Sequence, residues 1–343
     1  MLPDETETSW AAILFGAGWA SAWLLCLGTG LHAINWFMAM TAMPSAAVEL
    51  DAVPLISWAT TVFLVFSIIG GASGGLLKIR HGARRLLSIC TLVFLAGTLV
   101  AALAPGMTVL LVGRALQGVA EGVILAVSYA LVRELFPPRA IPQAFALLAM
   151  VYAVCAALGP LAAGILTEWA GWRWAFLPNL PLALAYLGLL HRGLAQRTSA
   201  AETPAGPVAG LRLSLIGIAA LCICLAGLAE RGAAIVAGLL AGLACCAGLL
   251  ALDRRSAEPL FPRGAFTLAT PIALGLWVAL LLPAASAGVQ VYVPYLIQVI
   301  GGGSAMVAGY LGALTAIGWS TAAILVARLP QRHAGAALVA GVS

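Results

Sequence analysis

Residues 75–85 read GLLKIRHGARR and place four positive charges and a histidine within eleven residues. Apolar sequence lies on both sides of this turn, with ISWATTVFLVFSIIGGASG at 56–74 and LLSICTLVFLAGTLVAALA at 86–104. About 20 apolar residues are enough to cross the roughly 30 Å of bilayer hydrocarbon as a helix. The pattern therefore predicts two membrane helices joined by a short basic turn.

The composition of the whole chain indicates a membrane-embedded protein. Of 343 residues, 63% are hydrophobic and 8% are charged, whereas a soluble domain carries about 25% charged residues. The apolar runs are continuous rather than alternating, which is typical of helices and not of barrel strands. The sequence therefore predicts an all-α polytopic membrane protein. The acidic start MLPDETETSW argues against a cleaved signal peptide, and the net charge of +5 reflects the loops rather than a nucleic-acid partner.

Hydropathy divides the chain into successive membrane helices. They are expected near 14–44, 53–77, 86–104, 107–134, 143–167, 173–191, 211–229, 231–252, 270–299 and 305–327, with an eleventh beginning at about 334. The stretch 193–210 (GLAQRTSAAETPAGPVAG) is polar and rich in Pro and Gly, so it is the expected linker.

Lysine and arginine gather in alternate loops between these helices. If the N-terminus is cytoplasmic, the cytoplasmic loops hold fourteen of the seventeen: Lys78, Arg80, Arg84, Arg85, Arg133, Arg139, Arg192, Arg197, Arg212, Arg254, Arg255, Arg263, Arg328 and Arg332. Cytoplasmic loops carry the excess of Lys and Arg in membrane proteins. The sequence therefore predicts a multi-pass protein of the plasma membrane with a cytoplasmic N-terminus, expected in a bacterial inner membrane.

The basic turn resembles a signature of the major facilitator superfamily. In that family the loop between the second and third membrane helices runs G-x-L-A-D-R-x-G-R-R. The matching residues, which the resemblance implies are a conformational motif, are Gly75, Arg80, Gly82, Arg84 and Arg85. Ile79 replaces the usual acidic residue, and this departure puts the charge-relay role of that loop in doubt.

Three further stretches resemble the superfamily in order and spacing. LLVGRALQGVAEG (110–122) resembles its R-x-x-Q-G motif, AALGPLAAG (156–164) the G-P-x-x-G-G signature of exporters, and WRWAFLPNLPL (172–182) the opening of the sixth helix in drug:proton antiporters. The exporter signature matches through Gly159, Pro160 and Gly164. The resemblance implies the fourteen-helix branch of multidrug efflux proteins and covers nearly all of the chain.

The resemblance implies a major facilitator fold, in which two helical bundles are related by pseudo-two-fold symmetry and two extra helices lie between them. The expected parts are an N-terminal six-helix bundle (1–192), a cytoplasmic linker (193–210), two inserted membrane helices (211–252) and the start of a C-terminal bundle (268–343). On the family pattern about three and a half helices would follow, so the second bundle is expected to be incomplete and the chain to be a fragment.

Small residues on the expected helix 143–167 predict a packing face. Cys155, Gly159 and Ala163 recur every four residues, as do Ala156, Pro160 and Gly164. Such a face lets another helix pack closely and slide, and Pro160 removes a backbone hydrogen bond. We expect a kinked, smooth helix that suits a rocking transporter, with close packing and no moving part as the alternative. Trp169, Trp172 and Trp174 are expected to anchor the outer interface.

Two ionisable residues fall well inside an expected membrane helix, Arg114 and Glu121. Their seven-residue spacing places them on one face, about 10 Å apart along the axis, which is too far for a direct salt bridge. Charges inside a membrane are costly and are therefore candidates for function. Each is expected to face a cavity, water or a partner on another helix.

The two residues are assigned different roles. For Arg114 the resemblance implies proton exchange or substrate binding, and a structural hydrogen-bonding post is the alternative. Glu121 lies outside the shared motif, but a carboxyl group in a low-dielectric site takes up a proton more readily than one in water. Glu121 is therefore the predicted proton-coupling group, and a permanently neutral, hydrogen-bonded glutamic acid is the alternative.

The first helix departs from the family pattern. The fourteen-helix branch usually has an acidic residue there, in a pattern such as L-D-x-T-I-V-N-V-A-L-P, but the aligned stretch INWFMAMTAMP has Asn35 at that place. Because an asparagine cannot carry a proton, either Glu121 has taken over proton coupling or coupling is lost.

Polar side chains on apolar helices are the candidates for a substrate cavity. They are Asn35, Trp36, Gln117, Tyr129, Gln290, Tyr292, Tyr295 and Gln298. Gln290, Pro294 and Gln298 share one helix face by four-residue spacing. Tyrosines and glutamines in an apolar cavity suit bulky, weakly polar ligands. For each residue, a hydrogen bond between helices is the alternative.

No motif indicates an enzyme, a cofactor or a metal. The seven cysteines all fall inside apolar runs, as small buried hydrophobes do, and the four histidines are far apart. We predict an exporter of drugs or other amphipathic small molecules that works by proton-coupled alternating access, with protons, substrate and lipid as partners and a monomer as the expected state. The alternatives are an uncoupled facilitator or importer of a small metabolite, and a non-transporting truncated paralogue.

Overall fold

The structure is a computed structural model, and it is helical throughout its described part, in which no strand occurs. The residues described are 14–16, 19–194, 207–227, 229, 231–255, 267, 270–311, 314, 318 and 321. Seven helical segments among them are long and apolar enough to cross a membrane. These segments confirm the prediction of an all-α polytopic chain.

The helix bounds lie within six residues of the hydropathy prediction, and the helix expected at 305–327 is described as helical over 305–311. The α-helices are α2 (Trp19–Glu49), α3 (Ile56–His81), α4 (Ala83–Ala102), α5 (Met107–Leu135), α6 (Ile141–Ala170), α7 (Asn179–Gly193), α8 (Pro207–Gly227), α9 (Gly232–Arg254) and α10 (Pro271–Tyr295). Between them lie the 3-10 turns η1 (Val53–Leu55), η2 (Pro138–Ala140) and η3 (Trp172–Phe176), and the π-helix η4 (Leu296–Ile300) follows α10.

α8 begins before the predicted end of the linker. Its first residue is Pro207, so it occupies the last residues of the stretch 193–210. The helix expected to begin at about 334 lies outside the described residues.

The basic turn of the sequence is one residue long. α3 ends at His81, α4 begins at Ala83, and Gly82 between them has a φ of 75°. Side chains other than glycine rarely adopt this backbone conformation, so Gly82 is what permits so short a reversal. The predicted turn is confirmed.

The described helices belong to two compact units. The first unit comprises Met1–Asp51, Val127–Arg197 and Pro294–Ser343, and the second comprises Ala52–Ala126 and Thr198–Val293. The chain crosses from the second unit to the first within α5.

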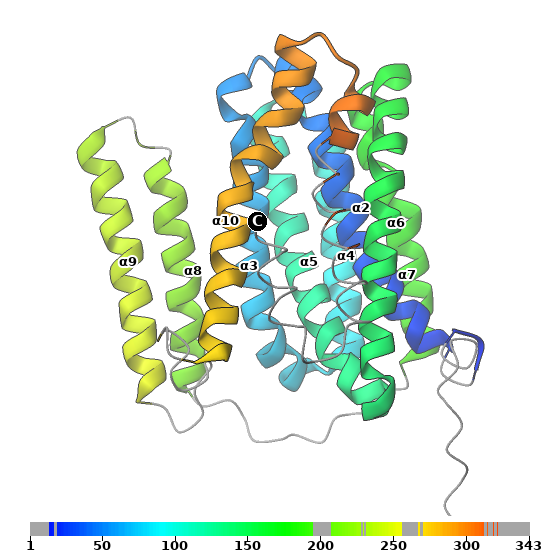
Figure 1. The fold of residues 1–343 in the computed structure, drawn as a ribbon, viewed down its shortest axis with the longest axis vertical. Coiled ribbons are helices and arrows are strands. Elements are labelled where there is room, and N and C mark those ends of the chain that lie inside the picture. The colour runs from blue at the N-terminus through cyan, green and yellow to red at the C-terminus, as the bar shows by residue number, and fades with distance from the viewer. Residues whose placement is uncertain are drawn as a thin grey trace, which may run out of the picture. The chain divides into compact units, whose positions relative to one another are not determined.

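In the first unit α2 packs against α6, α7 and η3 (Figure 1). Ala33 and Phe37 of α2 form a buried cluster with Cys155 and Ala156 of α6. A Cβ added to Gly159 would lie 2.8 Å from the Cβ of Phe37, so this glycine allows the close approach. The close packing predicted for this face of α6 is thus confirmed, and its role in helix sliding stays a prediction.

In the second unit α5 makes backbone contact with α3. Gly118 lies against the carbonyl of Phe63, Gly122 against that of Ser67, and Gly70 of α3 against that of Val119. On its other side, Gly113 of α5 fits against Ala101 of α4, where an added Cβ would lie 2.6 Å from the Ala101 nitrogen. Small residues at these positions let the helices pack without intervening side chains.

α8 and α9 form an antiparallel pair in the second unit (Figure 1). Gly238 of α9 fits against Ala226 of α8. Arg212 of α8 donates to Asp253 of α9 over 2.9 Å, and both side chains are buried. α8 in turn packs on α3, where Gly227 adjoins Trp58.

One expected interface anchor is buried. Trp169 and Trp174 are exposed to 87% and 52%, as anchors would be, but Trp172 is exposed to only 1%. Trp172 packs edge-on against Phe176 within η3, and the guanidinium of Arg173 stacks 4.3 Å above its ring. The prediction of an anchoring role for Trp172 was therefore wrong, because the 3-10 turn directs its side chain inward.

Candidate functional site

Arg114 is a buried cation held by neighbouring groups of the second unit. Its side chain is 2% exposed. Its Nη1 donates to Oε1 of Gln117 over 2.8 Å, and its Nε donates to the carbonyl of Ala59 on α3 over 3.4 Å. Its guanidinium also lies 4.2 Å from the ring centroid of Phe63, where the ring's quadrupole attracts a cation.

Gln117 extends this network to α4. Its Nε2 donates to Oγ1 of Thr98 over 2.9 Å, and the hydroxyl of Thr98 donates to the carbonyl of Phe94. The amide of Gln117 therefore joins Arg114 to α4, and its side chain is fully buried. These contacts fit the alternative in which Arg114 is a structural residue that joins helices by hydrogen bonds. The role of Arg114 in proton exchange stays a prediction.

Glu121 lies two turns further along α5 and is 1% exposed. It interacts electrostatically with Arg114. Burial favours the neutral form of a carboxyl group, whereas a nearby cation favours the charged form. The role of Glu121 as the proton-coupling group stays a prediction.

Replacing Arg114 by lysine is expected to destabilise the second unit by about 2 kcal/mol, because hydrogen bonds of charged groups are worth about 1.5–3 kcal/mol. A lysine ammonium lacks the planar fork that bonds Gln117 and Ala59 and stacks on Phe63. The measurement is the free energy of unfolding in detergent micelles. Arg231→Lys, at an exposed arginine before α9, is the matched control, and equal stability of the two variants would contradict the network.

Asn35 lies in the packed interior of the first unit and lines neither pocket described below. Its Oδ1 accepts a hydrogen bond from Nδ2 of Asn179 on α7 over 3.3 Å, and both side chains are fully buried. This bond is the helix–helix alternative considered for the cavity candidates. Trp36 is half-buried and packs against the cluster of α2 and α6.

The predicted cavity residues on α10 and η4 differ in how far their side chains are exposed. Tyr292 is exposed to 50%, Tyr295 is half-buried, and the side chain of Gln290 lies outside the described part of the chain. The π-helix begins at Leu296, where the amide of Gly301 donates to the carbonyl five residues earlier. The helix thus changes to π geometry before Gln298, and the predicted face shared by Gln290, Pro294 and Gln298 stays a prediction.

Gln298 binds α2 through both ends of its amide. Its Nε2 donates to the carbonyl of Thr41 over 3.1 Å, and its Oε1 accepts from the hydroxyl of Ser45 over 3.2 Å. Gly309 also fits against Thr41 and against Pro160 of α6. The segment after α10 is thus fastened to the helices of the first unit.

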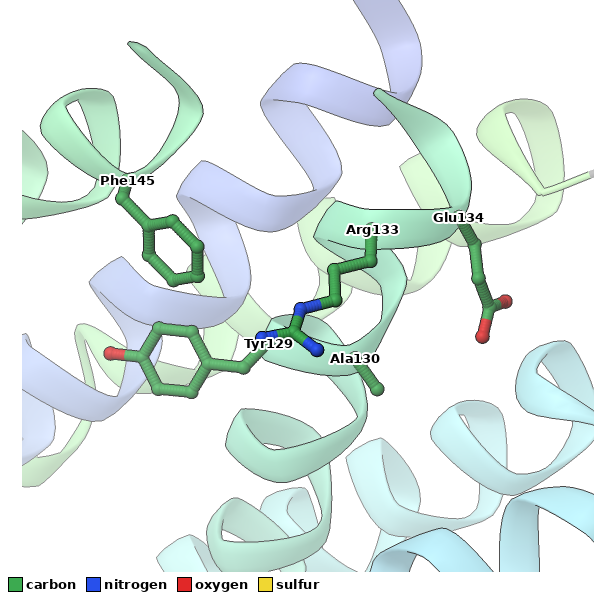
Figure 2. Close-up of a pocket in the computed structure, with 5 residues that line it drawn as sticks. All are labelled: Tyr129, Ala130, Arg133, Glu134 and Phe145. Atoms are coloured by element: carbon green, nitrogen blue, oxygen red, sulfur yellow. The ribbon is translucent and has the colours of Figure 1, made fainter. Parts of the chain in front are cut away.

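Tyr129 lines a pocket of about 690 Å³ in the first unit with Ala130, Arg133, Glu134 and Phe145. The rings of Tyr129 and Phe145 stack with their centroids 5.9 Å apart. Figure 2 shows these rings facing one another from α5 and α6, the Arg133 side chain extending to the Tyr129 side, and Glu134 pointing away. Phe145 and Arg133 were not among the residues predicted for a cavity, although an aromatic residue beside a basic helix end is a signal for such a pocket.

The described residues contain no cluster of His, Cys, Asp and Glu that could hold a metal ion. Cys26, Cys90 and Cys155 are buried single thiols. Arg114 and Glu121 on α5 are the ionisable residues predicted for the site, and both are buried.

The sequence model of the Major Facilitator Superfamily matches residues 25–343. The chain belongs to this superfamily. It is therefore a multi-pass chain of a membrane transporter family, as the motifs around Gly82, Arg114 and Pro160 indicated.

Relatives within the Major Facilitator Superfamily include proteins named for drug efflux. A probable multidrug-efflux transporter of Mycobacterium tuberculosis is 31% identical over 314 residues, which cover 89% of this chain and 66% of that protein. The multidrug transporter protein MdtP of Bacillus subtilis is 25% identical over 296 residues, covering 82% and 53%. The chain thus spans about two thirds or less of the length of these relatives.

Solved structures of the superfamily share the fold. A peptide transporter gives a TM-score of 0.64 at 16% identity and covers 93% of this chain and 70% of that chain. A D-xylose–proton symporter gives a TM-score of 0.55 at 18% identity, covering 90% and 67%. At these identities the likeness concerns the helical fold alone.

Proposed function

We propose that this chain exports drugs or other amphipathic small molecules by proton-coupled alternating access. The observation that carries the proposal is that two ionisable residues on one face of α5, Arg114 and Glu121, are both buried. The names of the relatives support drug efflux as the direction and substrate class. The alternation of basic loops supports a plasma-membrane protein whose N-terminus is cytoplasmic.

Proton exchange at Glu121 is the proposed coupling step. When the site faces outward, the carboxylate takes a proton from the outside, which leaves the charge of Arg114 less compensated and weakens the hold on a cationic or polar substrate. When the site faces inward, substrate binding favours loss of the proton to the cytoplasm. One proton thus enters the cell for each substrate molecule that leaves.

Glu121→Gln is expected to reduce gradient-driven transport more than tenfold. Glutamine matches glutamate in size, but its amide cannot take up or release a proton at physiological pH. The packing on α5 is therefore kept while proton coupling is lost. The measurement is ethidium accumulation in inverted membrane vesicles energised by a pH gradient. Asp51→Asn, at an exposed residue between α2 and η1, is the control with an equal loss of charge.

Transport that is indifferent to both the gradient and Glu121→Gln would point instead to an uncoupled facilitator, the second candidate function. Asn35 and Ile79 favour that candidate, because each stands where the family pattern has an acidic residue. Complete absence of transport by the unaltered chain would contradict export by this chain and favour a non-transporting paralogue.

A further inference from the structure

The first unit contains a second cavity, of about 750 Å³, at the C-terminal ends of α2 and α6. Residues of η3 and of the segment 298–305, which follows α10, also line it. Binding sites for small organic molecules span about 300–1,000 Å³. The cavity is therefore large enough for the head and part of the body of an amphipathic molecule.

The charged residues that line the described walls are two carboxylates, Glu49 and Glu168. Glu49 forms an ion pair with Arg173, which stacks on Trp172. Glu168 is exposed and has no ion-pair partner in the described part of the chain. Of the two carboxylates, Glu168 is thus the one whose negative charge is not compensated by an ion pair within the described ranges, and it favours a cationic group on a ligand.

Two hydrogen-bonding groups of the wall lack a partner among the described residues. They are the indole Nε1 of Trp172, whose side chain is 1% exposed, and the hydroxyl of Thr167. Leaving such a group unsatisfied in a buried position costs about 1–3 kcal/mol. The indole N–H can only donate, so it requires an acceptor, such as a carbonyl, ester or phosphate oxygen. The amide of Gln298 is different, since both its ends are already bonded to α2.

The tryptophans beside the cavity indicate its depth in the membrane. Trp169 and Trp174 are exposed on either side of Trp172, and exposed indoles settle at the level of the lipid headgroups. In the orientation proposed above, this level is the outer face. Amphipathic molecules gather there with their polar heads in the interface.

We infer that this cavity binds the head of an amphipathic molecule that carries both an ammonium group and an acceptor oxygen. The ammonium group pairs with Glu168, and the oxygen accepts from Trp172 and Thr167. Ethanolamine phospholipids of the outer leaflet and free amphipathic amines with an ester or carbonyl group share this chemistry. The inference rests on the proposed orientation and is independent of proton coupling.

The test is binding to the purified full chain in detergent, measured by calorimetry. Lysophosphatidylethanolamine has the ammonium group, and lysophosphatidylglycerol of equal chain length lacks it. The unaltered chain is expected to bind the first at least fivefold more tightly. Glu168→Gln should remove this preference, and Trp172→Phe, which deletes the N–H, should weaken binding of both lipids. Asp51→Asn, at an exposed residue that lines neither pocket, is the control and should leave the preference unchanged.

Competition with tetracaine, an amine with an ester carbonyl, distinguishes between the two kinds of ligand, ethanolamine phospholipids and free amphipathic amines. Binding of the ethanolamine lipid that tetracaine cannot displace assigns the cavity to lipid. Binding of tetracaine that depends on Glu168, without binding of the lipid, assigns it to free amines. Equal affinities of the unaltered chain for both lipids with no tetracaine binding, or a preference that survives Glu168→Gln, would overturn the inference. Because Glu168 is exposed, that variant is expected to fold even if Trp172→Phe does not.

Discussion

Gly122→Ala is expected to lower the free energy of unfolding by about 3 kcal/mol or more, the upper range for overpacking of a well-packed interior. The added methyl group would collide with the carbonyl of Ser67 and would lie 2.8 Å from the backbone nitrogen of Gly71. Both obstacles are backbone atoms of α3, which cannot move aside as a side chain can. α3 and α5 would therefore have to separate along their length.

Separation of these helices also affects the candidate site. The contacts that Arg114 makes with α3, to the carbonyl of Ala59 and the ring of Phe63, depend on the same close approach. Gly118 itself lies against the carbonyl of Phe63. Gly122→Ala should therefore disturb the setting of Arg114 as well as the fold, so transport should fall together with stability.

The matched control is Gly75→Ala on α3. A Cβ at Gly75 would meet nothing within 4 Å, and alanine favours a helix by up to about 1 kcal/mol relative to glycine. The midpoint of thermal unfolding in detergent is expected to fall for Gly122→Ala and to stay level or rise for Gly75→Ala. A similar midpoint for the two variants would show that the helices are not held by backbone contact.

The sequence predicted the features that depend on local order. Continuous apolar runs set the helices, because each run must cover the bilayer core by itself. Gly82 was predicted as the turn between two helices, since only a residue without a Cβ tolerates its φ of 75° so readily. The small-residue face of α6 was also predicted, because residues four apart in a helix lie on the same side.

Features that depend on partners distant in sequence were not predicted. The hydrogen bond of Asn35 to Asn179 joins residues 144 positions apart. No sequence pattern near either residue indicates that the two are partners. Trp172 was misplaced because its neighbours Trp169 and Trp174 do face outward, while a 3-10 turn rather than an α-helix sets its own direction. The two hydrogen bonds of Gln298 to α2 join residues 257 and 253 positions apart and were likewise not predicted.

The ion pair between α8 and α9 is a further long-range feature, and breaking it is expected to have a large effect. Arg212 and Asp253 lie 41 residues apart in sequence and are exposed to only 6% and 3%. Removing one member of a buried pair leaves the other charge uncompensated and costs about 3–5 kcal/mol. Arg212→Ala is therefore expected to destabilise the α8–α9 pair by about that amount, measured as the free energy of unfolding in detergent.

A double variant distinguishes the charge from the packing. Replacing the whole pair by apolar residues, Arg212→Leu with Asp253→Leu, leaves no buried charge and is expected to recover most of the lost stability, because such replacements are often neutral or favourable. Arg254→Ala, at the exposed residue next to Asp253, controls for the loss of a positive charge at this helix end. If the double variant were as unstable as Arg212→Ala, the side chains would act through their packing volume. If Arg254→Ala matched Arg212→Ala, the net charge of the helix end would be responsible. Recovery in the double variant alone would establish that the instability of Arg212→Ala comes from the uncompensated buried charge of Asp253.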